Sequence, residues 1–210
     1  MEDGTWRKKE SDKRRTEGVV WIISLCLGLC GAFLAGAPSL KERQLQKEIS
    51  QEVLRFHVLA NSDSQEDQAE KLRVKEAVVK KLQPVLAEAS SREETKKLVA
   101  EQMEEIQEEA FSLVTPRKVR VSLETDWFPE KTYGDCTFPP GEYEALRIEI
   151  GEAKGHNWWC VLYPGLCFKE AANGVVPQES KEKLEVLLDE QAYDFILHPK
   201  KVKIRFRWLG

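Results

Sequence analysis

The chain has 210 residues, of which 32% are charged, and its formal net charge at pH 7 is −4. This mild acidity argues against a nucleic-acid-binding protein, because such proteins usually present a basic surface. After an uncharged segment near the N-terminus, about 170 residues remain, which is enough for one domain with its own buried core.

The N-terminal region predicts export. Residues 1–17 contain six basic side chains, and residues 18–38, GVVWIISLCLGLCGAFLAGAP, are uncharged. This order predicts that the N-terminus stays in the cytoplasm and that the domain formed by residues 40–210 is translocated to the extracytoplasmic side. The small residues 35–37 favour a cleavable signal peptide, although Pro38 is a poor neighbour for cleavage. A retained transmembrane anchor is the alternative, because the run approaches the roughly 20 residues of a spanning helix.

The exported part begins with a polar segment and an alternating segment. Residues 40–52 carry apolar side chains at helical spacing and predict either a short stalk or a first helix. Residues 53–60 alternate apolar and polar side chains, with Arg55 and His57 on the polar side. This pattern is typical of a half-buried strand.

Two helices are expected next. The first should begin at Asp63 or Ser64, which can accept the free amide hydrogens of the first turn, and it should end or kink at Pro84. The second should begin at Ser90-Ser91 and stop at Thr115-Pro116. Each helix has an apolar stripe for packing on a neighbouring element.

The second half of the domain changes to a period of two. Residues 119–123 and 146–150 alternate in the manner of strands, with an ordered aromatic loop between them, and residues 202–208 alternate in the same way. Residues 179–191 are helical in pattern. A strand, two helices and then several strands predict an α+β fold, with helices packed on an antiparallel or mixed sheet.

The segment GHNWWC, residues 155–160, raises the question of catalysis. Cys160 near His156 would suit a thiol nucleophile with its base. Outside the cytoplasm oxidation is the simpler fate, and the turn between Cys160 and Cys167 makes a disulfide between them geometrically easy. Cys136 remains a spare thiol or an alternative partner, because cysteine spacing does not fix connectivity.

Other polar and aromatic motifs have simpler explanations than chemistry. Asp63, Glu66 and Asp67 could form a carboxylate pair for acid and base work, but helix capping accounts for them. Trp158 and Trp159 could grip a sugar, but adjacent strand residues point to opposite faces. We therefore expect one tryptophan in the core and the other exposed.

Two long segments resemble the stage II sporulation protein R family. The first comprises LRFHVLANSDS at 54–64, EDQ at 66–68 and LRVK at 72–75. The second comprises YG at 133–134, FPPGEY at 138–143, GEAKGHNWWCVLYP at 151–164 and LCF at 166–168. The segments stand in the family's order, and the resemblance covers about residues 50–170.

The resemblance implies an exported signalling protein of endospore formation. Such a protein is made in the forespore and enters the space between the two membranes, where it activates a membrane-embedded aspartic protease of the mother cell. That protease processes the sigma-E precursor. The family brings no established catalytic residues, so the resemblance implies a protein that is not an enzyme.

We therefore expect a partner-binding surface rather than a catalytic site. Its candidate residues combine turn chemistry with aromatic side chains: Asn61, Asp63, Asp67, Gln68, His156, Asn157, Trp158 and Trp159. We expect no cofactor, metal, nucleic acid or small-molecule substrate, and membrane contact only through residues 18–38. The alternatives are a secreted cell-wall hydrolase that uses Cys160 and His156, and a membrane-anchored carbohydrate-binding module.

Overall fold

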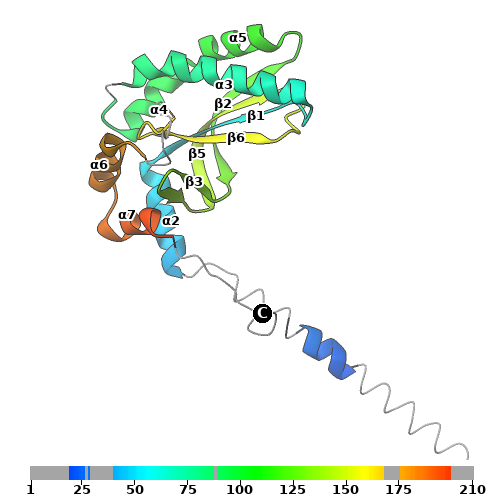
Figure 1. Cartoon of the computed structure of the whole chain (residues 1–210), viewed down its shortest axis with the longest axis vertical. Helices are drawn as coiled ribbons and strands as arrows, with labels where there is room; N and C mark the ends of the chain where they lie inside the picture. Colours follow the sequence, from blue (N-terminus) through cyan, green and yellow to red (C-terminus); the bar gives the residue numbers. More distant parts are fainter. Residues whose placement is uncertain (1–18, 27, 29–39, 88, 168–175, 200–210) are drawn as a thin grey trace, which may run out of the picture. The chain divides into compact units, whose positions relative to one another are not determined.

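The computed structural model in Figure 1 describes residues 19–26, 28, 40–87, 89–167 and 176–199. The chain divides into two units, residues 1–43 and residues 44–210. In the first unit, residues 19–26 and 28 are helical. No helix within the described ranges is long and apolar enough to span a membrane. Most of the predicted export segment 18–38, and all of the predicted strand 202–208, lie outside these ranges.

A four-stranded mixed sheet organises the second unit. Its strands are β1 (Leu54–Leu59), β2 (Val119–Phe128), β5 (Gly141–Ile150) and β6 (Asn157–Tyr163), in the spatial order β2-β5-β1-β6. Strand β1 runs parallel to β5 and antiparallel to β6, and β2 runs antiparallel to β5. The aromatic loop predicted between the strands forms a hairpin of β3 (Lys131–Tyr133) and β4 (Cys136–Phe138).

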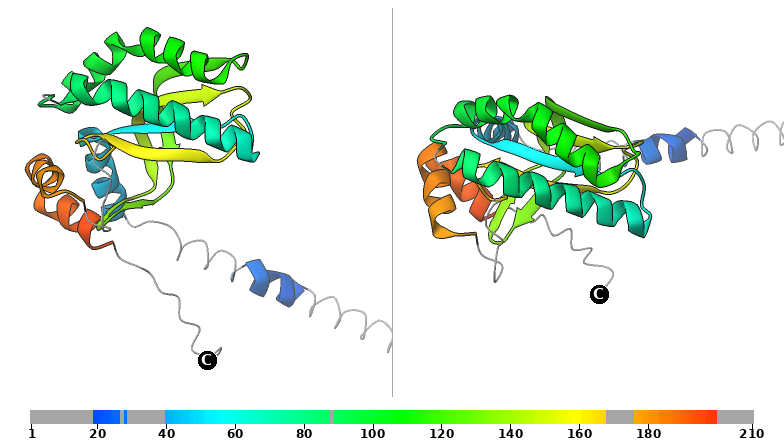
Figure 2. Two further views of the ribbon diagram at one scale, coloured as in Figure 1. Left: turned by 45° about the horizontal axis from the view of Figure 1, so that its top comes forward. Right: turned by 90° about the horizontal axis from the view of Figure 1, so that it is seen from above.

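Helices cover the sheet on both sides. They are α2 (Leu40–Glu52), α3 (Gln65–Leu86), α4 (Arg92–Glu101), α5 (Met103–Val114), α6 (Gln178–Leu187) and α7 (Glu190–Leu197). In Figures 1 and 2, α3, α4 and α5 lie along one face, which we call the first face, and α2, α6 and α7 gather at one end of the opposite, second face. The α+β prediction with a mixed sheet is confirmed.

Strand β1 supplies side chains to two separate cores. Leu54, Phe56 and Val58 pack beneath the helices of the first face. Arg55 and His57 point to the second face, where we expected exposure, yet their side chains are buried as well. The half-buried prediction for this strand is therefore wrong, because aromatic side chains from other strands cover its polar side.

Three helix boundaries differ from the sequence prediction. Helix α3 continues through Pro84 to Leu86, because the burial of Leu82 and Leu86 outweighs the backbone hydrogen bond that proline cannot donate. The second predicted helix is divided at Gln102 into α4 and α5. The predicted helix 179–191 is divided where Asp189 accepts a hydrogen bond from the amide of Ala192 and starts α7.

Candidate functional site

Two turns that are far apart in the sequence meet at one end of the sheet. The first, residues 60–64, joins β1 to α3, and the second, residues 151–156, joins β5 to β6. The amide of Gly155 donates to the carbonyl oxygen of Ala60 at 3.0 Å, and the amide of Lys154 donates to that of Asn61 at 3.2 Å. We call this pair of turns, with the first turn of α3, the two-turn surface.

The carboxylate of Asp67 holds the first turn in shape. Its Oδ2 accepts hydrogen bonds from Asn61 Nδ2 at 2.8 Å and from Ser62 Oγ at 2.5 Å. Its Oδ1 lies 2.8 Å from Nη2 of Arg117. The hydrogen bond from Ser62, followed by that from Asn61, holds the pKa of Asp67 below its usual value.

Asp63 and His156 clip the two turns together. Asp63 Oδ1 accepts a hydrogen bond from the amide of His156 and also contacts its Nδ1, each at 2.6 Å. The side-chain hydrogen bond from His156 is the main cause of a lowered pKa for Asp63. Gln68 and Lys71 extend the clip, because Lys71 Nζ donates to Gln68 Oε1 at 2.5 Å and to the His156 carbonyl oxygen at 2.8 Å.

Exposure separates the polar candidate residues into two kinds. The side chains of His156 and Asp63 are 83% and 56% exposed, whereas that of Asp67 is 4% exposed. Asn61, Gln68 and Asn157 are intermediate. Asp63 and His156 can therefore touch a partner directly, whereas Asp67 can act only through the shape of the turn.

The two tryptophans lie on opposite faces of β6, but both are half-buried. Trp158 meets Phe56 edge-on at 5.4 Å between ring centroids, and Lys75 Nζ lies 5.3 Å from its ring. Trp159 stacks on His57 at 4.9 Å. The expectation of one core and one exposed tryptophan is wrong. Because β6 is an edge strand, each tryptophan has neighbours on one side only and stays partly exposed on the other.

A buried histidine on the second face escaped the sequence analysis. His57 packs against the rings of Trp159 and Phe128, which also contact each other, and its Nε2 is 3.3 Å from Asp126 Oδ2 without hydrogen-bond geometry. Burial lowers its pKa from 6.5 to about 4, and Asp126 opposes this effect. The sequence showed His57 at a polar position of an alternating strand. It could not show that the side chain is buried, because the residues that bury it come from strands far away in the chain.

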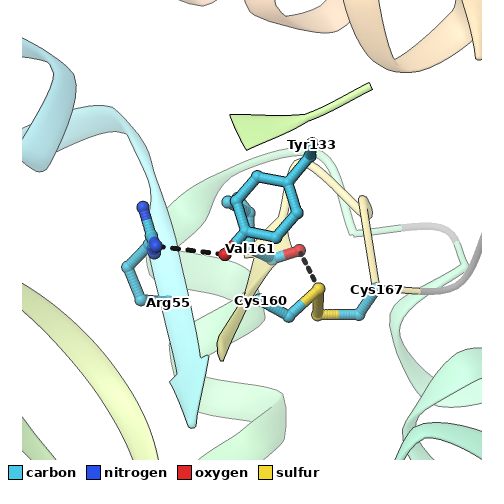
Figure 3. Close-up of a disulfide and its surroundings, with 5 residues drawn as sticks. All are labelled: Arg55, Tyr133, Cys160, Val161 and Cys167. Carbon is cyan, nitrogen blue, oxygen red and sulfur yellow. Dashed lines mark hydrogen bonds between the residues drawn. A yellow bond between two sulfur atoms is a disulfide. The ribbon is translucent and has the colours of Figure 1, made fainter. Parts of the chain in front are cut away.

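An arginine cage on the same face was also missed. Arg55 is fully buried and donates from Nη2 to the Tyr133 hydroxyl at 3.2 Å, as Figure 3 shows. Its guanidinium carbon lies 4.5 to 5.7 Å from the centroids of four rings, those of Phe128, Tyr133, Phe138 and Tyr143. Burial lowers the pKa of Arg55, and the neighbouring Tyr133 and Tyr143 side chains oppose this effect.

The cysteines form the predicted disulfide. Cys160 and Cys167 are bonded (Figure 3), with their Cα atoms 5.7 Å apart. The amide of Cys167 donates to the carbonyl oxygen of Val161 at 3.1 Å. Cys136 is the spare thiol, and burial raises its pKa to about 11. A cysteine nucleophile requires a free thiolate, so the disulfide-bonded Cys160 cannot serve as a nucleophile with His156 as its base, and the hydrolase alternative loses its site.

Replacing both Cys160 and Cys167 with serine is expected to lower the free energy of unfolding by about 2 to 3 kcal/mol, because the short loop is no longer closed in the unfolded chain. Urea unfolding with and without a reducing agent measures this. The unsubstituted chain should lose stability when reduced, whereas the double variant should not respond to the reducing agent. Equal stability of the two oxidised chains would contradict the prediction.

Fold and site together define an α+β domain in which two hydrogen-bonded turns form a partly exposed polar surface. Comparison with known proteins makes the assignment specific. Residues 50–173 match the family described as Stage II sporulation protein R. Stage II sporulation protein R of Bacillus subtilis (strain 168) is 34% identical over 197 residues, which cover 88% of this chain and 87% of that protein. No solved structure matches the chain.

The chain therefore belongs to the stage II sporulation protein R family, and its role lies in sporulation. This confirms the resemblance seen in the sequence. The family is not known as a family of enzymes. Both turns of the two-turn surface lie inside the matched residues 50–173.

Proposed function

We propose that this protein is an exported signal of endospore formation. It is made in the forespore, enters the intermembrane space through residues 18–38, and activates the membrane-embedded aspartic protease of the mother cell that processes the sigma-E precursor. The match to the sporulation family over residues 50–173 carries this proposal. The Cys160–Cys167 disulfide supports the export step, because such bonds persist in oxidising compartments.

In this proposal the two-turn surface contacts the protease. Asp63 and His156 present an exposed carboxylate and imidazole in fixed positions, and Gln68 lies beside them. Asn61 and Asp67 hold the turn beneath them, so they act by preorganising the surface rather than by touching the partner. Asn157, Trp158 and Trp159 continue the surface along β6 with half-buried aromatic area.

Activation of this kind needs no chemistry from the signal. A ligand shifts a two-state partner only by the difference between its affinities for the two states. Moving the protease from about 1% active to about 99% active requires about 5.5 kcal/mol of such preference. A few well-ordered polar and aromatic contacts can supply that amount.

Reconstitution tests the proposed function. The full chain, the protease and the sigma-E precursor are produced together in a non-sporulating host, and precursor cleavage is followed by immunoblot with and without the chain. We expect precursor cleavage to depend on the chain. In the double variant Cys160→Ser, Cys167→Ser, cleavage should fall only in proportion to the loss of folded protein. Cleavage that ignores the chain would reject the proposed function.

Replacing His156 with alanine is expected to reduce activation at least tenfold, while the unfolding midpoint changes little, because an exposed side-chain contact contributes little to stability. Precursor cleavage against signal concentration, together with thermal unfolding, separates the two effects. Lys154→Ala is the matched control, because Lys154 lies in the same turn and its ammonium group contacts only Glu152 at 3.3 Å. Equal activation by the two variants would remove His156 from the contact.

A further inference from the structure

Among the described residues, strand β2 lies at an edge of the sheet and pairs only with β5. The amide of Gly151 donates to the carbonyl oxygen of Lys118 at 2.8 Å, so residue 118 and the even-numbered residues of β2 direct their backbone groups toward β5. The odd-numbered residues direct theirs away from the sheet. These are Val119, Val121, Leu123, Thr125 and Trp127.

The open edge is only partly capped. The amide of Val121 donates to the side chain of Gln107 on α5 at 3.3 Å, and the amide of Trp127 donates to the side chain of Asp126 at 2.7 Å. In the part of the chain that the structure describes, the outward amides of Leu123 and Thr125 have no hydrogen-bond acceptor. A ten-residue edge with free backbone groups can accept another strand.

The side chains of β2 on the second face follow an ordered charge pattern. From the N-terminal side they are Lys118, Arg120, Ser122, Glu124 and Asp126, two basic residues, a small polar residue and two acidic residues. An antiparallel copy of the same strand, centred on Ser122, sets each basic residue opposite an acidic one. The pattern is therefore complementary to itself in one orientation.

We propose that β2 pairs with β2 of a second copy of this chain, antiparallel, about a two-fold axis at Ser122. Lys118 then faces Asp126 of the second copy, and Arg120 faces its Glu124, each pair occurring twice. Shifting the centre to Leu123 leaves only the pairs between Arg120 and Asp126, and centring on Glu124 sets two glutamates against each other. Only the Ser122 centre matches all four charged residues.

The other row of β2 is compatible with this register. On the first face, Val121 comes opposite Leu123 and Val119 comes opposite Thr125, pairs that favour strands. Charges on edge strands usually oppose association, but here their basic-to-acidic order favours this register over the registers centred on Leu123 and Glu124. Gln107 must release the Val121 amide before the copies pair, so we expect a weak, concentration-dependent dimer.

An added-cysteine experiment tests the register with the full chain purified in a mild detergent. Ser122→Cys brings two thiols face to face at a non-hydrogen-bonded position, where Cβ atoms lie about 4.5 to 5.5 Å apart, close enough for a disulfide. We expect a cross-linked dimer on a non-reducing gel at least tenfold above the unsubstituted chain. Arg120→Cys alone should not cross-link, whereas Arg120→Cys mixed with Glu124→Cys should. Cross-linking of Arg120→Cys equal to that of Ser122→Cys would overturn the register.

Charge exchange gives a second, independent readout. Arg120→Glu and Glu124→Arg should each weaken self-association at least tenfold in analytical ultracentrifugation, because like charges then face each other, and an equimolar mixture of the two should associate again. The dimer would be overturned if the unsubstituted chain stayed monomeric at all concentrations, or if the mixture associated no more strongly than either variant alone. If the chain is monomeric and the β2 substitutions abolish protease activation, the edge would be assigned to contact with the protease instead. No protease is present in either association assay, so they do not depend on the proposed function.

Discussion

Lowering the pH from 7 to 5 is expected to remove about 2 kcal/mol from the free energy of unfolding, because the folded domain keeps His57 neutral. The imidazole is 1% exposed and packs against two aromatic rings. Burial lowers its pKa from 6.5 to about 4, Asp126 and Glu124 oppose that effect, and Arg147 and Arg55 reinforce it. The effect of burial is larger than the attraction of the two acidic side chains.

The sign follows from which state takes up the proton. As the pH falls through 6.5, His57 is protonated in the unfolded chain but not in the folded domain, so protons favour unfolding. The loss continues until the pH reaches about 4, where the folded domain is protonated too. At about 1.4 kcal/mol per pH unit, the loss approaches about 3 kcal/mol at pH 4. That is a large part of a typical domain stability of about 5 to 15 kcal/mol.

Urea unfolding at several pH values measures this dependence. The unsubstituted chain should lose stability between pH 7 and pH 5, a range above the usual pKa of carboxyl groups, and His57→Gln should remove most of that slope. His156→Gln is the control, because its side chain is 83% exposed and it should leave the slope in place. If His57→Gln kept the full slope, another group would be responsible.

Replacing Gly155 with alanine is expected to lower the free energy of unfolding by about 3 kcal/mol or more, among the largest effects of a single methyl group. A Cβ atom at this position would lie 2.2 Å from the carbonyl oxygen of Ser62 and 3.0 Å from Cβ of Ala60. The obstacle at Ser62 is backbone, so no side-chain rotation can relieve it. The two turns would have to separate, with loss of the Gly155 hydrogen bond to Ala60.

Thermal and urea unfolding of Gly155→Ala measures this cost, and activation of the protease should fall with it. Ala153→Gly is a matched control in the same turn, because Ala153 has φ 51, where a side chain is strained by about 1 to 2 kcal/mol and glycine is not. That variant should be as stable as the unsubstituted chain or more stable. A Gly155→Ala domain of normal stability would show that the turns are not held in close contact.

Local signals in the sequence predicted much of the fold. Ser64 and Ser91 are the N-cap residues of α3 and α4, and each accepts the amide hydrogen three residues on. The alternation at 119–123 and 146–150 predicted β2 and β5. Each strand has ten residues and is therefore longer than the alternating segment that predicted it. Such signals were sufficient because capping and alternation depend on residues within a few positions of one another.

The candidate site was predicted as residues but not as an arrangement. Turn chemistry marked Asn61, Asp63 and Asp67, and the aromatic cluster marked His156, yet nothing local indicates that Asp63 and His156, 93 positions apart, share a hydrogen bond. The sequence also gave no sign that Asp67 is buried beneath the turn while Asp63 is exposed. Exposure depends on the neighbours that the fold supplies.

By itself, the amino-acid sequence determined the family, the element types and the strand alternation, and it favoured the Cys160–Cys167 pairing without fixing it. Only the tertiary structure decided the strand order β2-β5-β1-β6, the burial of Arg55 and His57, and the open edge of β2. The physical reason is range. Propensity, capping and short-loop closure act between residues close in the chain, whereas sheet order and burial are set by contacts between distant segments, whose combined free energy no local pattern records.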